Sequence, residues 1–540
     1  MSDHQSLLQR LERLNAIGVA LSSERDLSRL MEDILRGAME ITNADGGTLY
    51  MVMEDQRLRF QIMRTKSLKI AMGGTTGKEI PFSPLPLYLE DGTPNKTLVA
   101  AYAVLEDRVV NIRDAYEAEG FDFSGTRKFD QNTGYRSKSF LTIPMKNHEN
   151  EIIGVLQLLN AMDQESGEIV AFSQENERLV KSLASQAAVA LTNHNLIEGL
   201  KKLFESFISL IAKAIDEKSP YTGGHCLRVP QLTMMIAEAA NACKDGPLAS
   251  FHMNDKEMYE LSIAALLHDC GKVATPEYVV DKPRKLTTIF DRIEQIATRY
   301  EVLKRDAEIE YLNARLEALE QGRVQDTAAL EKSFKAKLLQ YDEELAFLRH
   351  INFGGESMLS EDQARVDTIA SRFWREAGKL VPFLSDDEVY NLKIPRGTLT
   401  KEERDIINNH IVVTISMLES LPYPKDLRRV PEYAGGHHER MDGKGYPKGL
   451  TREQMSIPAR MMGVADIFEA LTARDRPYKP AKTLSESLQI LGRMKEDHHI
   501  DPDIFDLFIR NKVYLKYAQA LLPKEQIDEV DERAIPGYVP

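Results

Sequence analysis

Side chains with the chemistry of metal ligands recur in five short patterns after residue 217. One pattern closes an apolar helix that begins at about Met258, and another precedes a glycine-rich turn. A single histidine on a helix is more often structural than metal-bound, but five such patterns in one chain indicate a shared site. In chain order, the candidate ligands are His225, His268, Asp269, His410, His437, His438 and Asp466.

Imidazole and carboxylate together are the ligand types of iron, manganese and zinc, rather than of calcium or a thiolate site. Neighbouring positions on a helix point about 100° apart, so His268 can hold one metal while Asp269 reaches between two. Bridged metals about 4 Å apart suit in-line displacement at phosphorus, and they lower the pKa of a shared water to about 7. They also neutralise the charge that grows on the phosphate. The ligand set therefore predicts a metal-dependent phosphohydrolase.

The five patterns together resemble the HD-GYP subfamily of HD-domain phosphohydrolases, over roughly residues 200–288 and 396–515. The string from His437 to Leu450, with Gly445-Tyr446-Pro447, is the most specific signal. The segments Lys282-Pro283, Lys285-Leu286-Thr287 and Arg476-Pro477-Tyr478-Lys479 add to the resemblance. It implies an all-helical bundle that hydrolyses cyclic di-GMP to the linear dinucleotide (pGpG) or to GMP.

The resemblance also implies two divalent transition metals, iron or manganese, with zinc as the alternative. One metal would be held by His225, His268, Asp269 and Asp466, and the second by Asp269, His410, His437 and His438. Asp269 would be shared between them.

Three basic residues match positions that handle the substrate. Lys272 would face a phosphate oxygen and either donate a proton or stabilise charge, while Arg476 and Lys479 would bind phosphates or guanines. Asp442 and Tyr446 are interpreted as loop-shaping residues that support the ligands.

The chain departs from the subfamily in two places. Some members have an acidic residue four places before the first histidine, and this acidic residue binds a third metal. Tyr221 stands there, so two metals are expected.

Residues 288–397 form an insertion in which two apolar stripes flank Gly322. The insertion is predicted to be a hairpin of two helices, each about 30 Å long, that pairs with another subunit or covers the active site. The stripes are Ile309, Leu312, Leu316 and Leu319, then Phe334, Leu338, Tyr341, Leu345 and Leu348.

The first third of the chain has the pattern of a mixed α/β domain. Leu8, Leu11, Leu14 and Ile17 recur at helical spacing, and Asp26 to Ile41 is predicted to form a second helix. Predicted strands are Gly47 to Met53, Leu58 to Thr65, Ser139 to Met145 and Ile152 to Asn160, with a long irregular segment between the second and third.

This region resembles a GAF domain, a small-molecule sensor fold, over about residues 20–190. The resemblance lies in Thr133-Gly134-Tyr135, Ser139 to Met145 and Ile153 to Asn160. Phe172 and Glu175 follow at a spacing seen in some members that bind cyclic nucleotides. The ligand remains an unknown small molecule, and a domain used only for dimerisation is the alternative.

A long helix is predicted from Glu175 to Lys218. Its apolar residues step by four, three, four and four, which suits packing against a partner helix. One interpretation is a signalling helix in a homodimer, and the other is a helix packed on its own domain. The apolar residues are Leu196, Leu200, Leu203, Phe207 and Ile211.

The composition and charge of the chain argue against several classes of protein and of site. The 540 residues carry a net charge of −14, which argues against binding polymeric nucleic acid. No apolar run reaches the roughly 18 residues of a membrane span, and Met1 begins no secretion signal, so a cytoplasmic protein is expected. Cys226, Cys243 and Cys270 form no Cys-x-x-Cys pair. Cys226 and Cys270, each beside a candidate ligand, are interpreted as small buried thiols. The pair His498-His499 is assigned to the surface or to packing.

The predicted fold is multidomain α+β: a GAF-like sensor, a linking helix, and an all-α HD-type bundle with an inserted helical hairpin. The boundaries are 1–195, 196–218, 219–515 (with 288–397 inserted) and a tail, 516–540. The leading function is a sensor-controlled cyclic di-GMP phosphodiesterase. The alternatives are hydrolysis of another cyclic dinucleotide or a nucleotide, a non-catalytic dinucleotide receptor, and a scaffold built on the hairpin.

Overall fold

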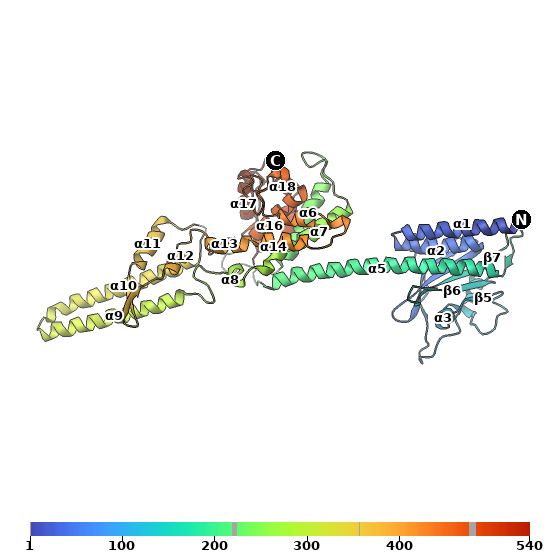
Figure 1. Ribbon diagram of the computed structural model, residues 1–540, viewed down its shortest axis with the longest axis horizontal. Coiled ribbons are helices and arrows are strands. Elements are labelled where there is room, and N and C mark those ends of the chain that lie inside the picture. Colours follow the sequence, from blue (N-terminus) through green and yellow to red (C-terminus); the bar gives the residue numbers. More distant parts are fainter. Residues whose placement is uncertain (1, 219–223, 356, 475–481, 540) are drawn as a thin grey trace. The chain divides into compact units, whose positions relative to one another are not determined.

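A computed structural model describes residues 2–218, 224–355, 357–474 and 482–539. The chain divides into two compact units, Met1–Phe204 and Glu205–Pro540, and helix α5 (Gln174–Lys218) contains the boundary between them (Figure 1). In the part of the chain that is described, no helix has both the length and the apolar character that a membrane crossing requires.

The first unit is built on an antiparallel sheet with the strand order β3-β2-β1-β7-β6-β5. Short strands β4 and β8 pair with β2 and β7. The strands are β1 (Ala44–Val52), β2 (Arg57–Thr65), β3 (Ile70–Gly73), β4 (Leu85–Pro86), β5 (Val110–Ile112), β6 (Phe140–Lys146), β7 (Ile152–Met162) and β8 (Ile169–Val170).

Helices α1 (Ser2–Ser23), α2 (Leu27–Thr42) and the first part of α5 cover one face of this sheet (Figure 1). The Asp26 carboxylate caps α2 by accepting from the Arg29 amide, and Leu30, Ile34 and Leu35 of α2 are buried against the sheet. The mixed α/β character of this region and the four predicted strands are therefore confirmed.

The segment between β2 and β6 was predicted to be irregular, and this prediction is wrong in part. It contains β3, β4, β5 and two helices, α3 (Val99–Leu105) and α4 (Ser124–Thr133). These elements are two to ten residues long, too short to show a clear period of 2 or 3.6. They pack on the sheet through separate small clusters that include Phe123 and Phe140.

The second unit is mainly helical. Its bundle consists of α6 (His225–Asn241), α7 (Asp255–Leu267), η2 (Cys270–Ala274), α8 (Glu277–Val280), α13 (Lys401–Asn408), α14 (His410–Glu419), α15 (Val430–Gly435), α16 (Ile457–Thr472), α17 (Leu484–Glu496), α18 (Pro502–Arg510) and α19 (Val513–Leu521). Within the predicted tail, 516–540, the described residues pack on this bundle: Ile535 is buried, and the Gln526 side-chain amide donates to the Thr472 carbonyl.

The insertion contains the predicted hairpin, formed by α9 (Ile293–Glu320) and α10 (Thr327–Asn352), which lie side by side (Figure 1). Tyr341, Leu345 and Leu348 of α10 are buried as their spacing predicted. On α9, however, the buried face is Ile296, Tyr300, Leu303 and Ala307, whereas the stripe from Ile309 to Leu319 is exposed. The insertion also contains α11 (Ser360–Ala370), a two-stranded sheet of β9 (Phe373–Glu376) and β10 (Lys379–Pro382), and α12 (Asp386–Leu392), none of which was predicted.

Candidate metal centre

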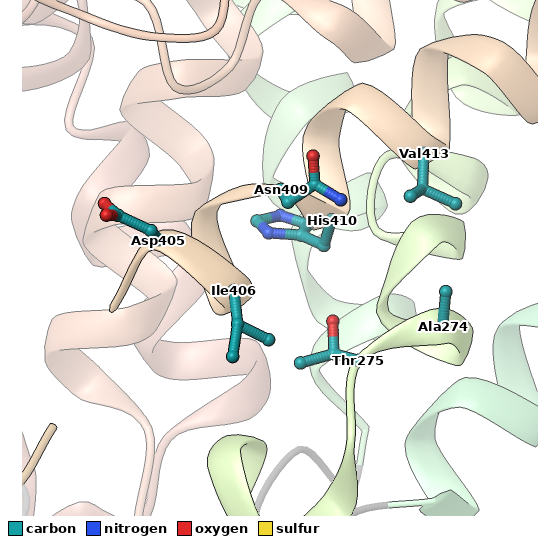
Figure 2. Close-up of a pocket in the computed structure, with 7 residues that line it drawn as sticks. All are labelled: Ala274, Thr275, Asp405, Ile406, Asn409, His410 and Val413. Carbon is teal, nitrogen blue, oxygen red and sulfur yellow. The ribbon is translucent and has the colours of Figure 1, made fainter. Parts of the chain in front are cut away.

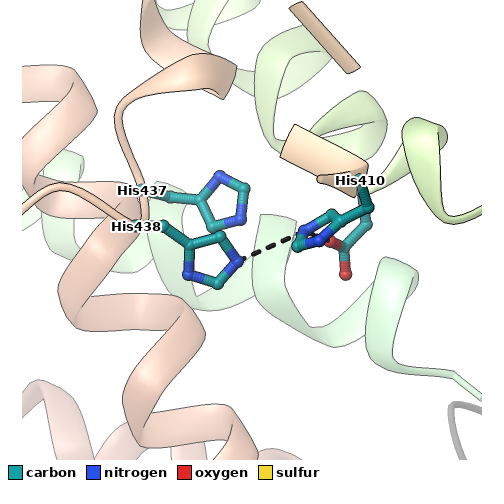
Figure 3. Close-up of side chains that lie close together, drawn as sticks. His410, His437 and His438 are labelled. Carbon is teal, nitrogen blue, oxygen red and sulfur yellow. Dashed lines mark hydrogen bonds and ion pairs between the residues drawn. The ribbon is translucent and has the colours of Figure 1, made fainter. Parts of the chain in front are cut away.

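The seven candidate ligands converge in the second unit as two groups. In each group, one ligand atom per residue lies within 4.8 Å of the others. Figure 3 shows three of the rings pointing toward one another. The first group is His225, His268 and Asp466, and the second is Asp269, His410, His437 and His438.

Each side chain is placed by a helix or a helix end. His225 and His410 are the first residues of α6 and α14, and Asp466 lies within α16. His268 is the C-cap of α7, so Asp269 leaves the helix where the chain turns into η2.

Asp269 lies between the two groups. Its Oδ2 is 3.3 Å from Nε2 of His225 and 3.3 Å from Nε2 of His268, while its Oδ1 is 3.2 Å from Nε2 of His410. Gly271 permits this position, because a Cβ there would lie 2.0 Å from the His410 carbonyl oxygen. One carboxylate oxygen thus faces each group, as a bridging ligand requires.

Hydrogen bonds to the backbone fix the tautomers of three histidines. Nδ1 of His268, His410 and His437 lies 2.5–2.6 Å from the carbonyl oxygen three residues earlier in the chain. A carbonyl can only accept, so each Nδ1 carries a hydrogen, and Nε2 is the nitrogen of each ring that is left to bind a metal.

His225 is oriented by a carboxylate instead. Its Nδ1 lies 2.5 Å from Oε2 of Glu469, and the other oxygen of Glu469 accepts from Nε of Arg228 at 2.6 Å. A carboxylate behind an imidazole fixes the ring and raises its basicity as a metal ligand. No role was assigned to Glu469 from the sequence, although its position three residues after Asp466 on one helix was a usable signal.

The donor set fits a pair of metal ions. Two atoms about 2.1 Å from one ion and about 100° apart lie about 3.2 Å from each other, which matches the separations around Asp269. Nε2 of His268 is 3.4 Å from Nε2 of His225, a separation that also suits two nitrogens bound to one ion. Oδ1 of Asp269 and Nε2 of His437 are buried without a hydrogen-bond partner, as metal-ligating atoms would be.

The charges in the site also favour a cation. Burial opposes protonation of His225, but the carboxylates of Asp269, Asp466 and Glu469 outweigh it and raise the pKa of His225 well above its usual value. Burial lowers the pKa of His438 to about 4 and that of His437 well below its usual range. These two rings are therefore neutral, which is the form that binds metal.

Lys272 lies against the bridging carboxylate, with Nζ 2.5 Å from Oδ2 of Asp269. Burial opposes its charge, but Asp269 more than compensates and raises the pKa of Lys272. Lys272 is therefore an ammonium beside the cluster, able to donate a proton or to stabilise an anion.

The loop after the paired histidines is shaped by its own side chains. The Tyr446 ring stacks on His438 with centroids 4.8 Å apart. The Glu439 carboxylate accepts from the amides of Lys448 and Leu450, and Asp442 pairs with Arg440. Tyr446 therefore contacts a candidate ligand, whereas Asp442 contacts only residues of the loop itself.

A cavity of about 360 Å³ opens beside His410 (Figure 2). Thr275, Asp405 and Asn409 supply its polar lining, and Ala274, Ile406 and Val413 its apolar lining. This volume lies within the range of small-molecule sites, about 300–1,000 Å³. A ligand that occupied it would contact the second group of candidate ligands.

Several predicted features are not part of this cluster. Arg476, Lys479 and Tyr221 lie outside the described residues, so their predicted roles remain predictions. The thiols of Cys226 and Cys270 are buried, and burial raises the pKa of Cys270 to about 11. His498 and His499 precede α18 and belong to neither group.

A helical bundle around clustered histidines and aspartates defines the class of the second unit. Two family models of the HD domain match the second unit, one over residues 222–340 and the other over residues 385–504, and each match extends into the inserted segment. The GAF-domain model matches residues 26–191. The chain therefore carries a GAF domain followed by an HD domain.

Curated relatives match parts of the chain. A 3′3′-cGAMP-specific phosphodiesterase of Vibrio cholerae (number 1) is 39% identical over 18% of this chain and 22% of its own length. A second one from that organism (number 3) is 35% identical over 29% of this chain and 32% of its own. A cyclic di-GMP phosphodiesterase of Pseudomonas aeruginosa is 47% identical over 21% of this chain and 26% of its own. The chain thus spans about a third or less of the length of each of these relatives.

Proposed function

We propose that the HD domain is a metal-dependent phosphodiesterase that hydrolyses cyclic di-GMP to pGpG or GMP, under control of the GAF domain. The observation that carries the proposal is the position of Asp269, whose two oxygens face two separate groups of ligand atoms. Iron or manganese would occupy both groups, with zinc as the alternative, and we propose a cytoplasmic location.

Metals bound there would supply an activated water and neutralise charge on the phosphate. The chain's own residues fix the geometry and handle the proton. Hydrolysis forms a bond from a water oxygen to phosphorus and breaks the bond to the ribose 3′ oxygen, which leaves with a proton. The Lys272 ammonium would donate that proton or stabilise the phosphate oxygens, and its contact with Asp269 supports this role.

The direct test is turnover by protein purified anaerobically and loaded with manganese or iron. Cyclic di-GMP and 3′3′-cGAMP are incubated separately, and the products are resolved by chromatography. Conversion of cyclic di-GMP to pGpG or GMP is expected. Hydrolysis of 3′3′-cGAMP alone would support the second candidate, which the two Vibrio relatives favour. Tight binding of either dinucleotide without hydrolysis, by protein with two metals bound, would indicate a receptor instead.

We further propose that α5 pairs with the α5 of a second copy as a parallel coiled coil. Leu196, Leu200, Leu203, Phe207 and Leu210 step by four, three, four and three, and each is more than half exposed. The opposite side of the helix is occupied, because Ile208, Ala212 and Ile215 are buried. Asn193 continues the stripe at a position where a polar residue selects the register of paired helices.

Replacing Leu200 and Leu203 together by glutamate is expected to convert the dimer to a monomer. Four like charges would then face one another at the centre of the pair, and their burial without partners is unfavourable. Light scattering after size-exclusion chromatography measures the mass. Glu198→Lys, which lies away from the stripe, serves as the control and should remain dimeric. A wild-type protein that is monomeric at high micromolar concentration would contradict the proposal.

For the GAF domain, we propose an uncharged aromatic ligand. A cavity of about 470 Å³ is lined by aromatic side chains that include Tyr50, Phe60, Phe123 and Phe140. Asp122 is the one charged residue in its described lining, so no lysine, arginine or histidine there would neutralise a phosphate. Phe172 is packed in the core and Glu175 lies in the first turn of α5, and neither is among the lining residues.

A neutral indole derivative is expected to raise the thermal transition of the full chain, whereas cyclic AMP and cyclic GMP should leave it unchanged. Saturation at 100 times the dissociation constant would contribute about 2.7 kcal/mol. Thr126→Trp should abolish the shift by filling the cavity, and Thr133→Trp, outside the described lining, should not. Stabilisation by a cyclic nucleotide that Thr126→Trp removes would contradict the ligand class.

A further inference from the structure

The last turn of α5 makes hydrogen bonds to two segments that carry candidate metal-site residues, the start of α6 and the turn η2. Asp216 is buried and Lys218 is partly buried. They lie two residues apart, and each makes hydrogen bonds to a different segment of the second unit.

Asp216 caps the helix that begins with His225. The N-cap residue of α6 is Gly224, which has a φ of 86° and no side chain to cap the helix. Asp216 supplies the missing acceptor: its Oδ2 accepts from the Gly224 amide at 3.0 Å and its Oδ1 from the Cys226 amide at 3.3 Å. The first amides of a helix lack partners within it, and a carboxylate is favourable at that end. Asp216 therefore fixes the backbone on either side of His225.

Lys218 holds the turn that follows Asp269. Its Nζ donates to the carbonyl oxygens of Lys272 at 3.1 Å, Val273 at 2.5 Å and Thr275 at 2.6 Å. An ammonium has three donors, so this contact uses its full capacity. The three carbonyls belong to η2 and its C-cap, and from this turn the Lys272 side chain reaches Asp269.

We propose that Asp216 and Lys218 are positioning residues, through which the end of α5 sets the placement of His225 and Lys272 about Asp269. Both segments converge on the same atom, since Nε2 of His225 and Nζ of Lys272 both approach Oδ2 of Asp269. α5 begins in the first unit, so its last turn is where the linking helix meets the site. For its turnover readout, the inference rests on the proposed phosphodiesterase function.

Lys218→Met tests the contact to η2, because it keeps an apolar stem and removes all three donors. Lys213→Met, at an exposed position of the same helix, is the matched control. We expect kcat for manganese-dependent hydrolysis of bis(p-nitrophenyl) phosphate to fall about ten- to a hundredfold, since small misplacements have effects of that size. KM should change less than about twofold, and amide exchange of residues 270–276 should accelerate. Lys218→Arg should restore most of the activity, and Lys218→Gln replaces the methionine variant if that one does not fold.

Asp216→Asn tests the contact to α6, with Glu217→Gln as its control. Manganese affinity should fall about tenfold or more, as it does when groups that orient ligands are lost, and exchange at residues 225–229 should accelerate. Variants that match their controls in exchange, metal affinity and kcat would overturn the inference. A wild-type protein that binds metal but cleaves no cyclic dinucleotide would defeat the proposed function, while the exchange and affinity measurements would still decide this inference.

Discussion

Asp269→Asn is expected to reduce turnover by about a hundred- to a thousandfold, in line with the loss of one preorganised charge-stabilising group, and to leave fewer than two metal ions per chain. The carboxylate is nearly inaccessible to solvent, and each of its oxygens lies 3.2–3.3 Å from imidazole nitrogens of a different group. An amide has the same shape but offers one neutral oxygen, so it cannot bridge two cations. It also leaves the Lys272 ammonium without its carboxylate partner.

The measurements are metal content by mass spectrometry and kcat with a cyclic dinucleotide. Asp426→Asn is the control, because Asp426 pairs with Lys256 at the surface and far-UV circular dichroism should show both variants folded. His410→Gln should lose metal from the second group in the same way. Two tightly bound ions together with wild-type turnover in the asparagine variant would rule out a bridging role.

The candidate site was predictable from sequence because ligand chemistry needs particular residue types in short local patterns. Two such patterns can be recognised without knowledge of the fold: His268 and Asp269 at the end of an apolar helix, and the pair His437-His438 before a glycine-rich loop. Their mutual distances depend on long-range packing, such as the approach of η2 to α14 at Gly271. That approach leaves no periodic signal in the sequence.

Other features could not be predicted for physical reasons that differ from case to case. The spacing of the Ile309–Leu319 stripe predicts a helix, but it does not determine which face of α9 packs against α10. The buried face of α9 is the one that contains Tyr300 and Ala307. The small elements between β2 and β6 are stabilised by packing on the sheet rather than by their own periodicity. The capping of α6 by Asp216 joins two helices through hydrogen bonds that no local motif encodes.

The second large effect is expected from removing the charge of Glu469, the carboxylate that accepts from Nδ1 of His225, and it should appear as a loss of metal affinity. Glu469→Gln keeps an oxygen that can accept from Nδ1 of His225 but removes the negative charge. Metal affinity at the first group is expected to fall about 10- to 100-fold, the usual cost of removing a partner behind a ligating histidine. The second group does not contact Glu469 through its described hydrogen bonds, so the stoichiometry measured at limiting metal should drop from two ions toward one.

Glu260→Gln is the matched control for Glu469→Gln, because Glu260 is also a buried glutamate of the bundle, and it accepts from the Arg429 amide rather than from a candidate ligand. It should retain both ions even if its thermal stability falls. The comparison separates the loss of a buried carboxylate from the loss of the charge behind His225. If both variants bound manganese as the wild type does, Glu469 would only anchor Arg228. If both lost metal equally, the effect would reflect stability of the bundle, and the basicity of His225 would not depend on Glu469.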